Sequence, residues 1–230
     1  MRTAKGAGRA IGLLFLVQMT LSYLVNFAWM GKIFATPGFL VNAAEHPTLM
    51  GLCAVLGVAL GALGVAVAIL AFPVFRSYSH AWALWFFALA VAGFSLVVVE
   101  NINLMSMLSL SQAYAKASDV ERQLFQPLRG AVAASRNWAH FLELVIAGSN
   151  LVVFYAGQLR FRLIPRVLAA FGVAAALSQM AAVGMPLFGH AVVFPMLAPL
   201  GLCQLTLSIW LLTKGWPAEG PQAPASAGQG

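Results

Sequence analysis

Six apolar segments divide the chain, and each of them is long enough to cross a membrane. A helix that spans roughly 30 Å of hydrocarbon at about 1.5 Å per residue needs about 20 apolar residues. The segments of this length are residues 10–30, 47–75, 81–108, 138–157, 167–188 and 192–213. Hydrocarbon offers the backbone no hydrogen-bond partners, and barrel strands would alternate over about ten residues, so these runs predict helices. The pattern therefore predicts an all-α fold, an integral membrane six-helix bundle.

Composition supports lipid, rather than water, as the solvent around this bundle. Hydrophobic residues make up 61% of the 230 residues and charged residues 8%, whereas a soluble domain carries roughly 25% charged residues. A water-soluble fold of this composition would leave most of its surface apolar. The two cysteines, Cys53 and Cys203, are too few for a secreted disulfide scaffold. These properties exclude a disordered chain, a disulfide scaffold and a conventional soluble enzyme.

The distribution of the thirteen lysines and arginines between the loops predicts the orientation of the bundle. Cations in short loops are retained on the cytoplasmic side of a membrane. With both termini inside, that side holds eight of the thirteen cations: Arg2, Lys5, Arg9, Arg76, Arg160, Arg162, Arg166 and Lys214. Both termini are therefore predicted to be cytoplasmic. The cations lie between apolar runs, without the interleaved aromatic residues of a nucleic-acid surface, so we expect no nucleic-acid partner.

Two further segments are expected to lie outside the spans. The connection 109–137 contains Ser118 and Glu121, which have the spacing of a capping box and predict a short helix that stops at Pro127. The C-terminal segment 216–230 is rich in Pro, Gly, Ala and Gln and is expected to be a disordered tail.

Four polar residues of the third and fourth spans are expected at one height near the outer end of the bundle. Glu100 lies about 20 residues along the third span, hence roughly 30 Å from its cytoplasmic end. Glu100 and Asn103 are three residues apart, as are His140 and Glu143, so each pair shares one helix face. If the two faces meet, two carboxylates, an imidazole and an amide form an outward-facing polar pocket.

Such a pocket has two chemical interpretations. Carboxylates and neutral imidazoles supply lone pairs, so they can bind a divalent metal ion or relay protons. The histidines expected on the outer side, which are the candidate metal ligands, are His46, His140 and His190. Alternatively these groups are solvated or paired with Arg129 or Arg136, because polar groups cost little at a headgroup interface.

The other polar and small residues of the spans favour packing. Amides in lipid usually form hydrogen bonds between helices, and the deeper amides are Gln18, Asn150, Gln179 and Gln204. The glycines at positions 57, 61 and 64 allow a neighbouring helix to approach closely. Methionines of the outer half, including Met105 and Met107, offer thioethers to Cu(I), but methionine is more often a filler of irregular apolar gaps.

Five stretches resemble a known family. They are RAIGLLFL (9–16), PVFRSYS (73–79), LSLS (108–111), RLIPRVLAAFG (162–172) and APLGLCQLTLSIWLLTKGW (198–216). Together they are similar to the bacterial family called domain of unknown function 4386, whose members are multi-pass membrane proteins. The resemblance implies the bacterial cytoplasmic (inner) membrane and brings no activity or ligand. Members often carry Arg-x-x-Glu in the third span and Gln-Glu in the last, whereas this chain has no such arginine and reads Gln204-Leu205.

Three functions follow from these observations. The leading interpretation is a non-enzymatic membrane protein that binds or transports a small molecule, or regulates a membrane partner, through the outer polar pocket. The second is a membrane-embedded, metal-dependent hydrolase in which Glu100 or Glu143 acts as general base. The third is a structural membrane partner without a pocket. The sequence contains no phosphate loop, dinucleotide fingerprint, HExxH or GxSxG motif, and it leaves the ligand and the oligomeric state open.

Overall fold

The computed structural model describes residues 3–217, and within this range it contains helices and no strand. The elements, in chain order, are α1 (Ala4–Tyr23), η1 (Leu24–Trp29), α2 (Met30–Phe34), α3 (Phe39–Glu45), α4 (Pro47–Tyr78), α5 (His80–Lys116), α6 (Asp119–Arg122), α7 (Phe125–Phe161), α8 (Arg166–Gly184), η2 (Met185–Phe188), η3 (Phe194–Leu197) and α9 (Ala198–Lys214). Six helical segments in this range are long and apolar enough to cross a membrane. The predicted all-α bundle with six membrane helices is thereby confirmed.

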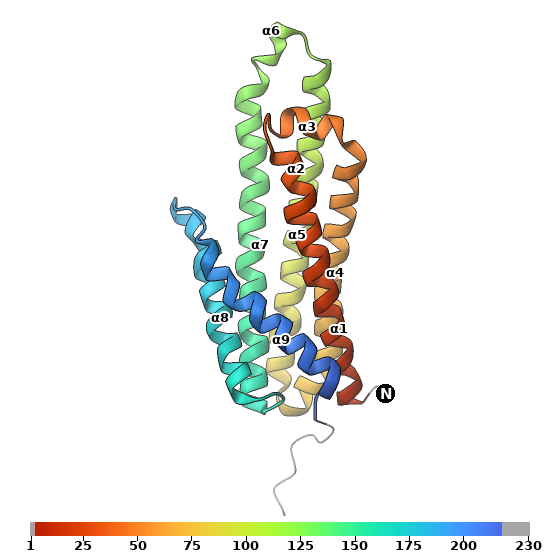
Figure 1. The fold of residues 1–230 in the computed structure, drawn as a ribbon, viewed down its shortest axis with the longest axis vertical. Coiled ribbons are helices and arrows are strands. Elements are labelled where there is room, and N and C mark those ends of the chain that lie inside the picture. The colour runs from red at the N-terminus through yellow and green to blue at the C-terminus, as the bar shows by residue number, and fades with distance from the viewer. Residues whose placement is uncertain (1–2, 218–230) are drawn as a thin grey trace, which may run out of the picture.

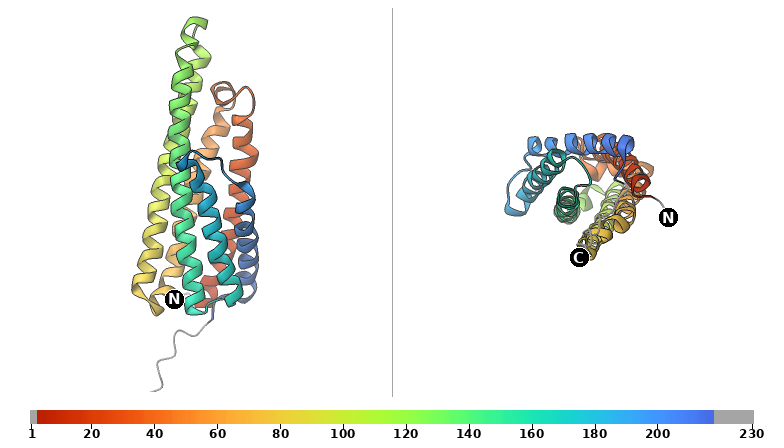
Figure 2. Two further views of the ribbon diagram at one scale, coloured as in Figure 1. Left: turned by 90° about the vertical axis from the view of Figure 1, so that its left-hand side faces the viewer. Right: turned by 90° about the horizontal axis from the view of Figure 1, so that it is seen from below.

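The six long helices form a ring instead of a solid bundle (Figure 2). Extensive contacts join α1 to α4, α4 to α5, α5 to α7, α7 to α8, α8 to α9, and α9 back to α1. Glycines close the ring between α1 and α9, because a Cβ at Gly12 would lie only 2.8 Å from the carbonyl oxygen of Ser208. The start of α1 and the end of α9 therefore lie at one end of the ring, called here the terminal end. Its cytoplasmic location stays a prediction.

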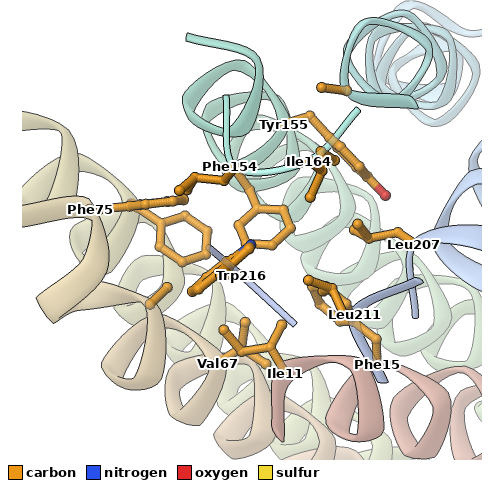
Figure 3. Close-up of a cluster of buried hydrophobic side chains, with 14 of the residues drawn as sticks. Ile11, Phe15, Val67, Phe75, Phe154, Tyr155, Ile164, Leu207, Leu211 and Trp216 are labelled. Atoms are coloured by element: carbon orange, nitrogen blue, oxygen red, sulfur yellow. The ribbon is translucent and has the colours of Figure 1, made fainter. Parts of the chain in front are cut away.

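The terminal end contains an aromatic core (Figure 3). Phe75, Phe154 and Trp216 lie at its centre, with ring centroids 5.9–6.4 Å apart. Trp216 is 1% exposed, and its Nε1 donates a hydrogen bond to Oε1 of Gln158 at 2.9 Å. The tail expected from residue 216 therefore does not include Trp216 itself, because the aromatic core holds the indole. Residues 218–230 lie outside the described range.

A second core lies at the opposite end, called here the hairpin end. Its buried residues are Val25, Met30, Ile33, Phe39, Leu40, Ala43, Met50, Cys53, Leu104, Met107 and Leu108. Met50 and Met107 are fully buried in this core, whereas Met105 is exposed. Met50 and Met107 therefore fill apolar space, as the packing interpretation expects, whereas Met105 does not.

Beyond this core α5 and α7 continue as a hairpin that is closed by α6 (Figure 1). Ser118 and Glu121 form the expected capping box, in which the Ser118 hydroxyl and amide both donate to Oε2 of Glu121. The short helix ends at Arg122, so the expectation that it runs to Pro127 is wrong. Pro127 instead lies in the first turn of α7, where proline is tolerated because its missing N–H would have no partner within the helix.

Candidate functional site

A cavity of about 350 Å³ lies between the two cores. Phe15, Val67, Phe86 and Phe154 belong to the terminal-end core and also line the cavity, while Val25, Met30, Cys53 and Leu104 line it from the hairpin-end core. Its polar lining comes from α1, η1, α5, α7 and α9, and comprises Gln18, Ser22, Asn26, Glu100, Asn101, Arg136, His140, Glu143, Asn150 and Gln204. The cavity therefore combines apolar walls from both cores with polar groups from five elements.

Helix periodicity directs the charged residues of α7 into this space. Arg136, His140 and Glu143 follow one another at intervals of four and three residues, which places them on one face of the helix. Ala147 and Phe154 continue the same stripe and line the cavity farther toward the terminal end. Because α5 packs along this face, it brings Glu100 opposite the three side chains.

Glu100 is the centre of the charged cluster, which is defined here as Glu100, Arg136, His140 and Glu143. Its Oε1 accepts a hydrogen bond from Nη2 of Arg136 and lies 3.1 Å from Nδ1 of His140. The side chains of Arg136 and Glu100 are only 11% and 13% exposed.

Glu143 completes the cluster without a direct partner. One ligand atom each from Glu100, His140 and Glu143 can be chosen so that all three lie within 4.8 Å of one another. No hydrogen bond or ion pair joins Glu143 to another residue of the described chain. Its carboxyl group therefore lies beside an ion pair and lines the cavity.

The depth of the cluster follows from the lengths of the helices. Glu143 lies eighteen residues from the end of α7 at Phe161, which corresponds to roughly 27 Å. The end of α8 at Gly184 lies equally far from its start at Arg166. The cluster is thus at the level of the α8–α9 connection, about one hydrocarbon thickness from the terminal end.

Three residues of the predicted site lie outside the cluster. Asn103 accepts a hydrogen bond from the Ser135 hydroxyl at 3.0 Å and does not line the cavity. His46 is exposed where α4 begins. It lies eleven residues, or roughly 16 Å along the helix, from Gly57, which is a residue of α4 that lines the cavity. His190 is exposed in the α8–α9 connection. Among the described residues, only His140 of the three candidate metal-binding histidines is near both carboxylates.

Two of the deeper amides, Gln18 and Asn150, join helices and also line the cavity. Gln18 of α1 donates to the carbonyl oxygen of Leu60 in α4 at 3.2 Å, and Asn150 of α7 donates to that of Phe86 in α5 at 2.7 Å. Both bonds link neighbouring helices, as expected for amides in lipid. Gln204 extends the polar lining to α9.

A π-helical segment at Leu24–Trp29 is a feature that the sequence analysis missed. It continues α1 at the level of the cavity and brings Asn26 into the lining. Short π-helical segments inside α-helices occur frequently at functional sites. The residues of this segment, LVNFAW, give no recognisable signal for it, because their apolar pattern is that of an ordinary span.

A comparison with known families agrees with the resemblance seen in the sequence. The model of the family described as Domain of unknown function (DUF4386) matches residues 10–215. The chain belongs to this family. No curated protein and no solved structure matches the chain. In this DUF4386 protein the matched range contains the cavity and all four residues of the cluster, so the site lies within the family domain.

Proposed function

We propose that this DUF4386 protein lies in the bacterial inner membrane and binds or transports a small molecule in the cavity between its two cores. The observation that carries the proposal is the charged cluster in the cavity lining. The Arg136 and Glu100 side chains are only 11% and 13% exposed, and His140 and Glu143 line the same part of the cavity. Partly buried charged groups that converge in a cavity are costly for packing alone, and they are candidates for binding a ligand or an ion.

The size and shape of the cavity agree with this function. Its volume of about 350 Å³ lies in the range of roughly 300–1,000 Å³ that small-molecule sites occupy. Apolar walls with a few convergent polar groups are also the usual composition of such sites. A ligand held there would have its polar part at the cluster and its apolar part toward Phe86 and Phe154. The same binding event could regulate a membrane partner.

Native mass spectrometry of the purified protein tests the proposal. We expect a co-purified small molecule to be lost from the variant Ala147→Phe, because Ala147 lines the cavity and the larger side chain would fill it. The matched control is Ala92→Phe, at an exposed position of α5, which should retain the molecule. Retention of the molecule by both variants would refute a cavity site, and so would its absence from the wild-type protein under all conditions of extraction.

A second candidate function is that of a membrane-embedded, metal-dependent enzyme. It is supported by the separation of the ligand atoms of Glu100, His140 and Glu143, which lie within 4.8 Å of one another. Carboxylate oxygens and imidazole nitrogens bind Zn²⁺ at about 2.0–2.2 Å, so a small closure of the three side chains would form a three-residue site. Elemental analysis distinguishes the two functions. Stoichiometric metal that is lost in Glu143→Gln would favour the enzyme.

A further inference from the structure

Packed cores close the cavity toward both ends of the ring. On the terminal side, the cavity is lined by Phe15, Phe86 and Phe154, and the Phe154 ring centroid lies 5.5 Å from that of Phe15 and 5.3 Å from that of Phe86. On the hairpin side, it is lined by Met30 and Cys53, which are only 3% and 1% exposed. Entry through either end would have to break one of these cores, which leaves the side of the ring.

The ring has an opening on one side, next to Ser22. Of the described residues that line the cavity, Ser22 alone is exposed. Within the described chain no extensive contact joins α7 to α1, η1 or α9, so the ring is completed on this side by α9, which contacts α8 and α1. α9 crosses obliquely from α8 to the start of α1 and covers the part near the terminal end (Figure 1). The part between Ser22 and the charged cluster on α7 is called here the side opening.

The side opening reaches the height of the lipid headgroups. Ser22 lies eighteen residues, or roughly 27 Å, from the start of α1 at Ala4, which is the height of Glu143 on α7. Because hydrocarbon is roughly 30 Å thick, this height is close to the headgroups of the leaflet on the hairpin side. Tyr23 and Phe27 follow Ser22 as two exposed aromatic residues that stack with ring centroids 5.5 Å apart. Tyrosine is enriched at such membrane–water interfaces, so the rest of the opening faces hydrocarbon.

We infer that the cavity takes one acyl chain of a membrane lipid whose headgroup lies at the charged cluster. The inference rests on the proposed function and names its ligand class. The cavity lining on α7 extends from Glu143 to Phe154, which are eleven residues or roughly 16 Å apart. This length is about half of the hydrocarbon thickness, the depth that the chains of one leaflet fill. A lipid that moves sideways through the opening therefore keeps the orientation and the height that it has in the bilayer.

The polar groups of the lining suit such a lipid. A guanidinium has five N–H donors, and the ion pair with Glu100 uses one of those of Arg136, so donors remain for an oxygen of the headgroup. The amides of Gln18 and Asn150 donate to backbone carbonyl oxygens of α4 and α5, so they lie beside the chain as partnered groups. A water-soluble ligand would have to pass through hydrocarbon to reach the side opening, whereas a lipid already lies beside it. The position of the opening therefore favours a lipid.

The test uses a phosphatidylcholine that carries a photoreactive diazirine at the end of one acyl chain. The full-length protein is reconstituted in phospholipid vesicles that contain this probe, irradiated after a fixed incubation and digested, and mass spectrometry identifies the crosslinked residues. We expect crosslinks to residues near the terminal end of the cavity, such as Phe86 and Phe154. Lipid that only surrounds the ring would crosslink to exposed residues such as Trp85 and Val91 instead.

Two pairs of variants separate the opening from the cavity. Ser22→Trp places a large side chain at the side opening and should lower the yield of cavity crosslinks about tenfold, because it hinders entry of the probe. Leu13→Trp, at a position of the same helix that is 54% exposed, should leave the yield unchanged. Ala147→Phe fills the cavity and should abolish the cavity crosslinks, whereas the exposed Ala92→Phe should retain them.

Each outcome bears on the inference. Wild-type crosslinks confined to exposed residues would overturn it, and so would cavity crosslinks that are unchanged in Ser22→Trp or in Ala147→Phe. A co-purified phospholipid that is lost from Ala147→Phe would support both the inference and the proposed function. A co-purified water-soluble molecule that is lost from this variant would keep the proposed function and overturn the lipid. Gel filtration checks the fold of Ser22→Trp, which we expect to be kept because Ser22 is exposed.

Discussion

The ion pair between Glu100 and Arg136 gives the sharpest prediction about the cluster. Both side chains are almost buried, at 13% and 11% exposure. Removing one partner of a buried pair leaves an uncompensated charge and typically costs about 3–5 kcal/mol, whereas removing both leaves no such charge and costs less than the two single substitutions together. The two substitutions Arg136→Met and Glu100→Gln should therefore be strongly non-additive.

The magnitude follows from the remaining contacts of each partner. In Arg136→Met, Glu100 keeps its contact of 3.1 Å with His140, so its carboxylate still has a polar neighbour. We therefore expect the free energy of unfolding to fall by about 3 kcal/mol, the lower end of the range. Glu100→Gln leaves Arg136 beside the amide and should cost about 2 kcal/mol. The double variant should lose about 2–3 kcal/mol, so the coupling energy is about 2 kcal/mol.

Equilibrium unfolding of the purified protein in mixed micelles, followed by far-ultraviolet circular dichroism, measures all four proteins of this cycle. Arg129→Met is the matched control, because Arg129 is an exposed arginine of the same helix and should lose less than about 1 kcal/mol. A coupling energy below about 0.5 kcal/mol would show that the pair is solvated, as surface pairs are. The reasoning that makes the cluster a site within the membrane would then fail.

Three further predictions concern the scaffold and the hairpin. Trp216→Ala should lower the free energy of unfolding by about 3–5 kcal/mol, because it empties the aromatic core, while Trp85→Ala, at an indole that is 65% exposed, should change it by less than about 1 kcal/mol. Thermal melting monitored by a thiol-reactive dye reports both, because the two cysteines are buried. Gly12→Leu should separate α1 from α9 and lower the yield of folded protein, since a Cβ there would lie 2.8 Å from the backbone carbonyl oxygen of Ser208, whereas Gly51→Leu should be tolerated because a Cβ there meets no atom within 4 Å. The yield of monodisperse protein in gel filtration distinguishes them. Hydrogen bonds from the Ser118 hydroxyl and, second, from the Ser118 amide lower the pKa of Glu121. The cap therefore stabilises α6 fully above the ordinary carboxyl pKa, and this stabilisation is lost as the pH falls through the lowered pKa. Proton exchange of the α6 amides should accelerate over that acidic range, and a rate profile identical to that of Glu121→Gln would contradict it.

The number and type of elements could be predicted from the sequence because hydrocarbon imposes a simple length rule. Every run of about 20 apolar residues became part of a helix. The limits of the helices followed a different rule. α5 runs to Lys116 and α7 starts at Phe125, both well beyond the predicted spans. In this extension the Ser111 hydroxyl donates to the Leu40 carbonyl oxygen of α3, and Tyr114 and Phe125 pack against the hairpin-end core. Hydropathy detects the membrane and does not detect such extensions.

The candidate site was predictable where it depends on helix periodicity within one span. His140 and Glu143 share a face of α7, and Glu100 lies at the same height on α5. Asn103 shows the limit of this reasoning, because its side chain bonds to Ser135 instead of lining the cavity. Three residues correspond to about 300° of helical rotation, so two residues at this spacing can still contact different neighbours.

Arg136 and Asn26 were the harder residues to assign. Sequence reasoning named Arg136 only as one of two arginines, with Arg129, that could pair with the polar groups, because it lies just outside the fourth predicted span. Whether Arg136 joins the cluster depends on how far α7 continues beyond that span, and this length is set by the hairpin of α5 and α7. Asn26 reaches the cavity through a π-helical segment whose residues are those of an ordinary span.

The residues that line the cavity favour an occupied space over a packed core. The cavity of about 350 Å³ combines apolar walls with convergent polar groups, which is the usual composition of a small-molecule site. Larger residues at Gly64, Ala90 or Ala147 would fill it without touching the ion pair. A chain that keeps small residues at these positions, near the Glu143 carboxylate without a partner, has the lining of a ligand-binding site. The stability of the protein should therefore rise when the ligand is bound.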